Sequence, residues 1–236
     1  RTFHYVFDGA PREGGGIPGR EKATGQGVVH QIEQWAEEKR VSLKGTTFTV
    51  QGCGKVGAWV IRLLSAAGAR LVAVQDLTGQ VASDGGIDAE ALLLHAVDHG
   101  GVAGYPNARV IGSDEFLRVS ADIFVPAAME NAITAQTAPW LNVRLVAEAA
   151  NCPTDPDGSR ILGERSIDVI PDVLCNSGGV VVSYLEWLQN KRSEISEPEE
   201  VDRKLEKAMR TAYAKVRTTA AEFSVDRRTA AHIVAL

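Results

Sequence analysis

Residues 46–57 read TTFTVQGCGKVG, and this stretch decides the fold. Its first half is mostly β-branched and apolar, which predicts a buried strand over Thr46–Gln51. Apolar residues then recur at helical spacing over Val56–Ala67, which predicts a helix. The turn that joins the two has the pattern Gly-x-Gly-x-x-Gly. Between a strand and a helix, this pattern is typical of a loop that binds the phosphates of a dinucleotide.

Each glycine of the turn is expected to have a different structural role. Gly52 permits the tight turn, Gly54 lets the backbone approach a pyrophosphate, and Gly57 lets the helix pack closely on the strand. The phosphates would meet the free N–H groups and the positive dipole end of the helix, whose first residues are Lys55 and Val56. A glycine-rich turn that binds nothing and a methyltransferase loop are the alternatives.

An acidic residue follows at the position that such a site requires. Arg70–Gln75 reads as a second buried strand, and Asp76 follows it, 19 positions beyond Gly57. An aspartate there accepts hydrogen bonds from the ribose hydroxyls and repels a 2′-phosphate. No Arg or Lys stands at positions 77–80 to receive that phosphate. The sequence therefore favours NAD, with NADP as the alternative cofactor; a plain loop aspartate is the other interpretation.

Strands and helices alternate along the rest of the central region. Continuous apolar strands separated by helices indicate a parallel sheet that is covered on both faces. The predicted fold class is α/β, a Rossmann-type doubly wound, mostly parallel sheet with extra C-terminal helices. Further strands are expected at Asp122–Val125, Arg144–Glu148 and Asp168–Ile170, and helices at Ala23–Lys39, Ala89–His99, Glu115–Val119, Ala135–Leu141 and Gly178–Asn190.

The two ends of the chain differ from this central region. Residues 1–19 carry many Gly and Pro turn signals and are predicted to be an interdomain connector. Residues 20–191 would form the Rossmann-type dinucleotide-binding domain, and residues 192–236 the C-terminal helices. The first of these helices should be capped by Ser196, with Glu199 completing a capping box. The last begins near Asp226, and the absence of a later helix breaker suggests a truncated chain.

Composition argues against several functional classes. The 236 residues carry a formal net charge of −5, which does not fit a basic nucleic-acid-binding surface. No apolar run approaches the roughly 20 residues of a membrane span. The three cysteines, at positions 53, 152 and 175, form no Cys-x-x-Cys pair and indicate reduced thiols in a cytoplasmic protein. No metal site is expected, and His95 and His99 are interpreted as a solvated helix face.

Small and polar residues follow the predicted strands. In an open parallel sheet, ligands bind beyond the carboxyl ends of the strands. Ala127 and Ala128 follow the third strand, Asn151 the fourth and Asn176 the fifth. One edge of the sheet should therefore carry the site.

The helix predicted from Gly178 adds a second group of candidates. Val180 and Ser183 are three residues apart, so they lie on one face of this helix. Together they would offer an apolar contact and a hydroxyl to one ligand. Helix packing with a solvated serine is the alternative, and spacing alone does not decide between them.

Five ordered segments resemble the family of glutamate, leucine, phenylalanine and valine dehydrogenases. The likeness extends from about Gly14 to Leu236, and the run SYLEW at 183–187 is similar to the glutamate branch. The five segments are GREKATGQGV at 19–28, QGCGKVG at 51–57, PAAMEN at 126–131, EAAN at 148–151 and IPD at 170–172.

The resemblance implies a fold, a reaction and a set of roles. In this family a cofactor domain faces an N-terminal substrate domain across a cleft, and the complete enzymes are typically homo-hexamers. An L-amino acid is oxidised to a 2-oxo acid and ammonia, and a hydride passes to the nicotinamide. By resemblance, Thr24 would hold the nicotinamide carboxamide, Gly52, Gly54 and Gly57 would hold the pyrophosphate, and Asp76 would hold the ribose. Ala127, Ala128 and Asn151 would line the nicotinamide side of the site, and Asn176 would lie between cofactor and substrate. Val180 would contact the substrate chain, and Ser183 would form a hydrogen bond with the side-chain carboxylate of glutamate.

The family's catalytic lysine and aspartate belong to the N-terminal domain, and nothing in this chain matches them. The chain would therefore contain no catalytic residue and would be inactive alone. It is expected to be the cofactor domain of an NAD(P)-dependent enzyme that converts L-glutamate to 2-oxoglutarate and ammonia. A leucine- or phenylalanine-type domain and a non-catalytic NAD-binding module are the alternatives. Ala149 and Cys152 stand where the family often has Gly, so their side chains would narrow the nicotinamide end of the binding site.

Overall fold

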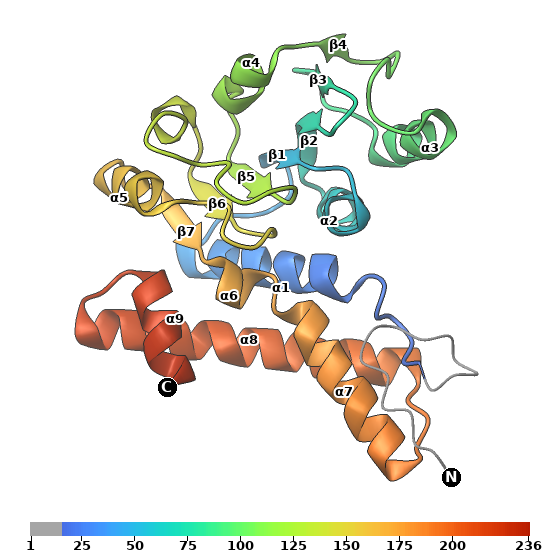
Figure 1. Ribbon diagram of the computed structural model, residues 1–236, viewed down its shortest axis with the longest axis vertical. Coiled ribbons are helices and arrows are strands. Elements are labelled where there is room, and N and C mark those ends of the chain that lie inside the picture. Colours follow the sequence, from blue (N-terminus) through green and yellow to red (C-terminus); the bar gives the residue numbers. More distant parts are fainter. Residues whose placement is uncertain (1–15) are drawn as a thin grey trace.

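A sheet of seven strands forms the centre of the computed structural model, which describes residues 16–236 (Figure 1). Most of the predicted connector therefore lies outside the described residues. The strand order is β4-β3-β2-β1-β5-β6-β7, so the chain crosses over from one half of the sheet to the other after β4. All five predicted strands are present and mutually parallel: β1 Thr47–Gln51, β2 Arg70–Gln75, β5 Ile123–Pro126, β6 Leu145–Ala147 and β7 Asp168–Ile170.

Two short strands at one edge were not predicted. β3, Gln80–Ala82, and β4, Arg109–Val110, extend the sheet beyond β2 in antiparallel pairing. Two or three residues are too few to show an alternating pattern in the sequence. The fold class is nonetheless α/β with a mostly parallel sheet, as predicted.

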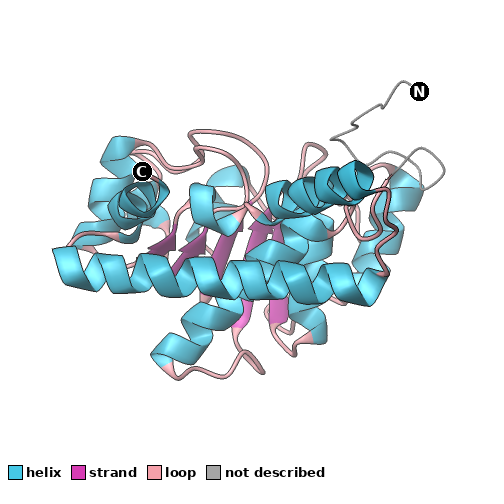
Figure 2. Cartoon of the chain, turned by 90° about the horizontal axis from the view of Figure 1, so that it is seen from below, coloured by secondary structure: helices cyan, strands magenta, loops and turns pink. Residues whose placement is uncertain are grey.

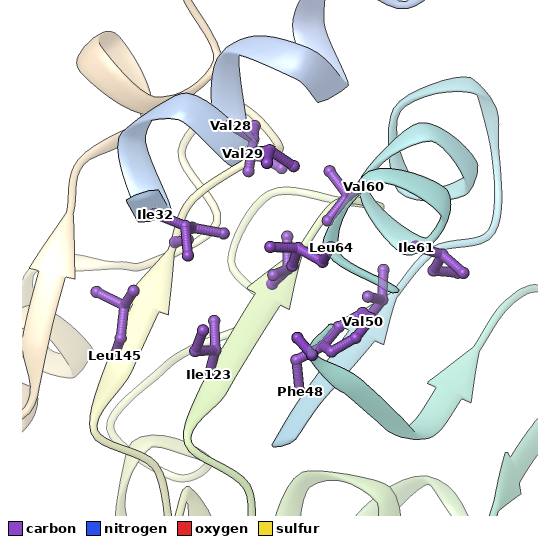
Figure 3. Close-up of a cluster of buried hydrophobic side chains, with 14 of the residues drawn as sticks. Val28, Val29, Ile32, Phe48, Val50, Val60, Ile61, Leu64, Ile123 and Leu145 are labelled. Atoms are coloured by element: carbon purple, nitrogen blue, oxygen red, sulfur yellow. The ribbon is translucent and has the colours of Figure 1, made fainter. Parts of the chain in front are cut away.

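Two apolar cores lie on opposite faces of the sheet. Along β5, Ile123 and Val125 belong to one core and Phe124 to the other, because successive strand residues point to opposite faces. Helices α1, Ala23–Lys39, and α2, Lys55–Ala66, cover the first face, and Figure 3 shows their aliphatic side chains above the strands. The second face is covered by α4, Ser113–Arg118, and α5, Pro156–Glu164, whereas α3, Ala89–His99, packs on the first.

Helix α5 was not predicted from the sequence, and the helix predicted over residues 135–141 is mostly absent. The interval 135–141 contains only a short 3-10 helix, Ala138–Trp140, because Pro139 and the short interval leave no room for full turns. Helix α5 was missed because Pro156 and Gly158 resemble a loop. Its start carries a recognisable signal, since the Asp155 carboxylate accepts the Gly158 N–H at 2.6 Å and Pro156 occupies the first turn.

Three helices complete the fold after a short turn, α6, Asp172–Cys175. They are α7, Gly178–Arg192, the long α8, Pro198–Phe223, and α9, Arg227–Ala235. Figure 2 shows α8 crossing in front of the strands, and it packs on α1, where the Gln31 amide donates to Met209 O at 2.9 Å. The cap predicted for α8 was wrong: the N-cap is Glu197, and the Ser196 N–H donates to the Gln189 side chain at 2.9 Å.

Candidate functional site

A groove runs along the carboxyl ends of the parallel strands. It consists of two adjoining hollows of about 470 and 540 Å³ that share Ala127, Ala128 and Met129, the residues after β5. The first hollow contains Gly52, Gly54 and Asp76 in its wall. The second has a wall that includes Thr24, Val56, Asn151, Asn176 and Val180. The fold therefore brings predicted residues from six separate segments to one edge of the sheet.

The glycine turn lies at the floor of the first hollow. Gly52 has a φ of +104°, which strongly favours glycine. A Cβ at Gly57 would overlap the carbonyl oxygen of Gly52, so the helix approaches the strand more closely than any side chain allows. A Cβ at Gly54 would meet nothing within 4 Å. No side chain caps the first turn of α2, so the space above Gly54 suits a phosphate group.

Asp76 holds two loops together at the end of β2. Its Oδ1 accepts the Thr78 N–H at 2.8 Å and the Thr78 hydroxyl at 2.6 Å, and its Oδ2 accepts the Val102 N–H at 2.9 Å. Gly79 adds a longer bond of 3.3 Å to Oδ1. A carboxylate has about four acceptor positions, two on each oxygen, so Oδ2 can still accept one donor. No local pattern identifies Val102 as a partner of Asp76, because the two residues are 26 positions apart.

Cys53 contributes a thiol to the wall beside Gly52. Burial, reinforced by the nearby charge of Asp76, raises the pKa of this thiol to about 11. The thiol therefore stays protonated near neutral pH, and only a thiolate is an effective nucleophile. Cys53 therefore lines the groove and is not a reactive nucleophile.

Close contact between α1 and α7 shapes the second hollow. A Cβ at Gly27 would lie 2.9 Å from the Cα of Gly178, so only glycines allow this approach. Thr24 and Val180 consequently face the same space. In the same wall, the Asn176 amide donates to Asn151 Oδ1 at 2.7 Å, which links the segment after β7 to the segment after β6.

Arg20 is the functional candidate that the sequence analysis did not single out. Its Nε donates to Ser183 Oγ at 2.9 Å, and its side chain lines the second hollow beside Val180. Ser183 itself is not in the wall and reaches the hollow through this guanidinium. The pair is 163 residues apart in sequence, so no local pattern could reveal it.

The predicted residues Lys55 and Gly57 stand outside the walls of both hollows. Lys55 is exposed at the first position of α2, and Gly57 is buried beneath the turn. Within residues 16–236, no three His, Cys, Asp or Glu side chains converge as metal ligands would. None of the helices in this range has the length and apolarity that a bilayer span requires.

Comparisons with known proteins match nearly the whole chain. A glutamate dehydrogenase of Thermotoga maritima is 40% identical over all 236 residues, which are 57% of its length. The hetero-hexameric glutamate dehydrogenase of Thermus thermophilus superposes with a TM-score of 0.89 at 30% identity, covering 94% of this chain and 53% of that one. The enzyme of Peptoniphilus asaccharolyticus gives a TM-score of 0.81 at 34% identity, covering 94% and 52%.

The chain thus spans a little over half the length of these relatives. The part that it spans carries the glycine turn and the groove described above. The family model for glutamate, leucine, phenylalanine and valine dehydrogenases matches residues 15–236. This match sets aside the methyltransferase interpretation of the glycine turn, and the chain belongs to the Glu/Leu/Phe/Val dehydrogenase family.

Proposed function

We propose that this chain is the NAD(P)-binding part of an enzyme that oxidises L-glutamate to 2-oxoglutarate and ammonia. One observation carries the proposal. A single groove has an uncapped glycine turn at one end and the hydrogen-bonded pair Arg20–Ser183 at the other. A dinucleotide fits the first end, and a substrate with a side-chain carboxylate fits the second.

The residues of the first hollow fit the adenosine and pyrophosphate portions of the cofactor. The pyrophosphate would lie over Gly54, where the helix dipole and the unpaired N–H groups of α2 favour negative charge. The free acceptor position on Asp76 Oδ2 would receive a ribose hydroxyl. When bound, the nicotinamide would supply the acceptor for the hydride from the substrate α-carbon, and Thr24, Asn151 and Asn176 of the second hollow would hold it.

The Arg20–Ser183 pair would select the substrate. Burying a carboxylate is costly unless charged or hydroxyl donors replace its water. Arg20 offers a guanidinium, and the Ser183 hydroxyl accepts the Arg20 Nε–H at 2.9 Å, which would hold that guanidinium at the hollow. The exposed side chain of Val180 provides an apolar surface next to them. This arrangement favours an acidic side chain over the branched or aromatic side chains of leucine and phenylalanine.

Ser183→Ala should therefore lower kcat/KM for glutamate in the complete enzyme. Loss of a hydrogen bond to a charged group costs about 1.5–3 kcal/mol, or roughly 10- to 100-fold. Norvaline, which lacks the side-chain carboxylate, is the internal control and should be turned over at nearly the unaltered rate. Steady-state kinetics with both substrates test this, and an equal loss for both would contradict the role of Ser183.

NAD should bind more tightly than NADP. Asp76 is the charged side chain in the described wall of the first hollow, and no Arg or Lys is present there. A second negative charge within about 4 Å costs roughly 1–4 kcal/mol, depending on exposure to water. Titration of the chain with both cofactors measures the difference. The same order should hold for 5′-AMP against 2′,5′-ADP, which differ only in the 2′-phosphate, and tighter binding of NADP would contradict the prediction.

We further infer a hexameric parent and a cytoplasmic location. The Thermus thermophilus relative is hetero-hexameric, which supports six subunits without deciding between identical and different chains. The three cysteines are free thiols, as expected of a reducing compartment. Size-exclusion chromatography with light scattering on the complete enzyme would test the assembly.

A further inference from the structure

Two adjacent arginines at the start of α9 bind two different pairs of carboxylates. Arg227 pairs with Glu38 at 2.8 Å and with Asp168, at the amino end of β7, at 3.2 Å. Arg228 pairs with Glu148 at 2.6 Å and with Asp172 at 3.2 Å. Of the carboxylates that Arg228 binds, Glu148 directly follows β6 and Asp172 lies two residues beyond β7, at the edge that carries the groove. One arginine is therefore linked to the groove and its neighbour is not.

Glu148 and Asp172 are joined to each other as well as to Arg228. The Glu148 side chain is 0% exposed, and its second oxygen accepts the Asp172 N–H at 2.8 Å. Asp172 in turn accepts the Cys152 N–H at 2.8 Å through Oδ2. The links through Glu148 and the link to the Cys152 N–H are short, charge-assisted hydrogen bonds, and the direct bond from Arg228 to Asp172 is longer, at 3.2 Å. The series leads from α9 to the backbone of the segment 149–152.

That segment forms part of the groove wall. It contributes Ala149, Ala150 and Asn151 to the second hollow, where Asn151 accepts the Asn176 amide. Cys152 has a φ of +46°, a conformation that side chains rarely adopt and that needs support from its surroundings. The bond from the Cys152 N–H to Asp172 supplies such support at the strained residue. Any change that releases Asp172 should let the segment relax and move Asn151.

We propose that Arg228 is a positioning residue for the nicotinamide end of the groove, acting through Glu148 and Asp172 on the segment 149–152. The proposal rests on the proposed function, because it concerns a dinucleotide in this groove. Arg228 does not line the second hollow, so it would not touch a cofactor or substrate bound there. It fixes the geometry of residues that do. Helix α9 would therefore affect cofactor binding through the residues that it positions, although it lies outside the groove.

Arg227 provides a matched control. It has the same charge, stands one position earlier on the same helix and makes the same number of ion pairs, but its carboxylates lie away from the groove. Arg227→Gln and Arg228→Gln should both reduce stability, since each strands partly buried carboxylates. Only Arg228→Gln should disturb the nicotinamide end.

The two ends of the groove can be separated by comparing NAD with ADP-ribose, which lacks only the nicotinamide. Both would be titrated into the 236-residue chain and its variants by calorimetry, with unfolding curves recorded in parallel. Arg228→Gln should weaken NAD binding about tenfold, the equivalent of one charged hydrogen bond, and leave ADP-ribose binding unchanged. Arg227→Gln should leave the ratio of the two affinities as it is in the unaltered chain.

A second variant keeps the test valid if Arg228→Gln does not fold. Glu148→Gln combined with Arg228→Gln removes both charges, so no carboxylate is stranded at position 148, yet Asp172 still loses its guanidinium. This double variant should also lower the NAD to ADP-ribose affinity ratio. An unchanged ratio, with ADP-ribose bound normally, would overturn the inference alone. Failure of the unaltered chain to bind either ligand would overturn the proposed function and the inference with it.

Discussion

The 236-residue chain is expected to bind NAD and to form no detectable NADH from glutamate. Oxidative deamination needs a positioned proton acceptor and an activated water in a closed cleft. In the described walls of the groove the ionisable side chains are Arg20, Cys53, Asp76 and Glu130, and no lysine is among them. Loss of general acid–base assistance alone costs about 10²–10⁴ in rate, and loss of substrate positioning adds to this.

Arg20, Cys53 and Asp76 do not provide such a base, and Glu130 is an exposed carboxylate that is not enclosed in a cleft. Asp76 holds two loops together and its remaining acceptor position is the one proposed for a ribose hydroxyl, and the raised pKa keeps the Cys53 thiol protonated. The carboxylate of Asp172 is likewise bound to Arg228 and to the Cys152 N–H. Calorimetric titration with NAD, followed by an absorbance assay for NADH with and without glutamate, tests the prediction. Glutamate-dependent NADH formation at the rate of a complete enzyme would refute it.

Gly57→Ala should destabilise the chain by more than about 3 kcal/mol and abolish dinucleotide binding. The new Cβ would overlap the Gly52 carbonyl oxygen and lie 3.3 Å from Val50 Cγ1. Overpacking against side chains costs about 1–3 kcal/mol, and here the main obstacle is backbone, which cannot rotate away. Helix α2 would have to move off β1, which would open the turn that is proposed to hold the pyrophosphate. Urea unfolding and NAD titration measure the two effects.

Two other glycines serve as controls for this substitution. Gly54→Ala adds a Cβ that meets nothing within 4 Å, so the chain should fold normally and lose affinity only, because the methyl group occupies the space for the phosphate. Gly163→Ala, in α5 and equally unobstructed, should keep binding and raise stability by about 0.5–1 kcal/mol. Unaltered stability of Gly57→Ala would mean that α2 and β1 are not packed as described.

Periodicity in the sequence was sufficient for the main parallel strands and most of the helices. The strand Thr47–Gln51 and the helix that follows it are regular enough for their apolar spacing to identify them. The same reasoning failed for β3 and β4, which are only two or three residues long and exist because β2 offers an unpaired edge. It also failed for α5, where the capping aspartate was present but two glycines and a proline concealed the helix.

For the site, the sequence by itself determined what is local along the chain. The glycine turn, and the acidic residue after the next strand, follow from the strand–turn–helix pattern, because each requirement is set by backbone conformation within a few residues. The carboxyl ends of parallel strands meet at one edge, which also allowed Asn151 and Asn176 to be grouped. The structure confirms that grouping, with a hydrogen bond of 2.7 Å between the two amides.

Only the tertiary structure decided which distant side chains meet. Arg20 and Ser183 are 163 residues apart, and Arg228 and Glu148 are 80 residues apart. Their contacts depend on how α1 packs on α7 and how α9 packs on β7, which sequence spacing does not encode. Asp76 shows both kinds of information. Its position after β2 follows from the local sequence, whereas its hydrogen bond to the Val102 N–H depends on how the two loops pack together. Short-range geometry is set by the chain itself, whereas ion pairs across the fold exist only after the helices have docked on the sheet.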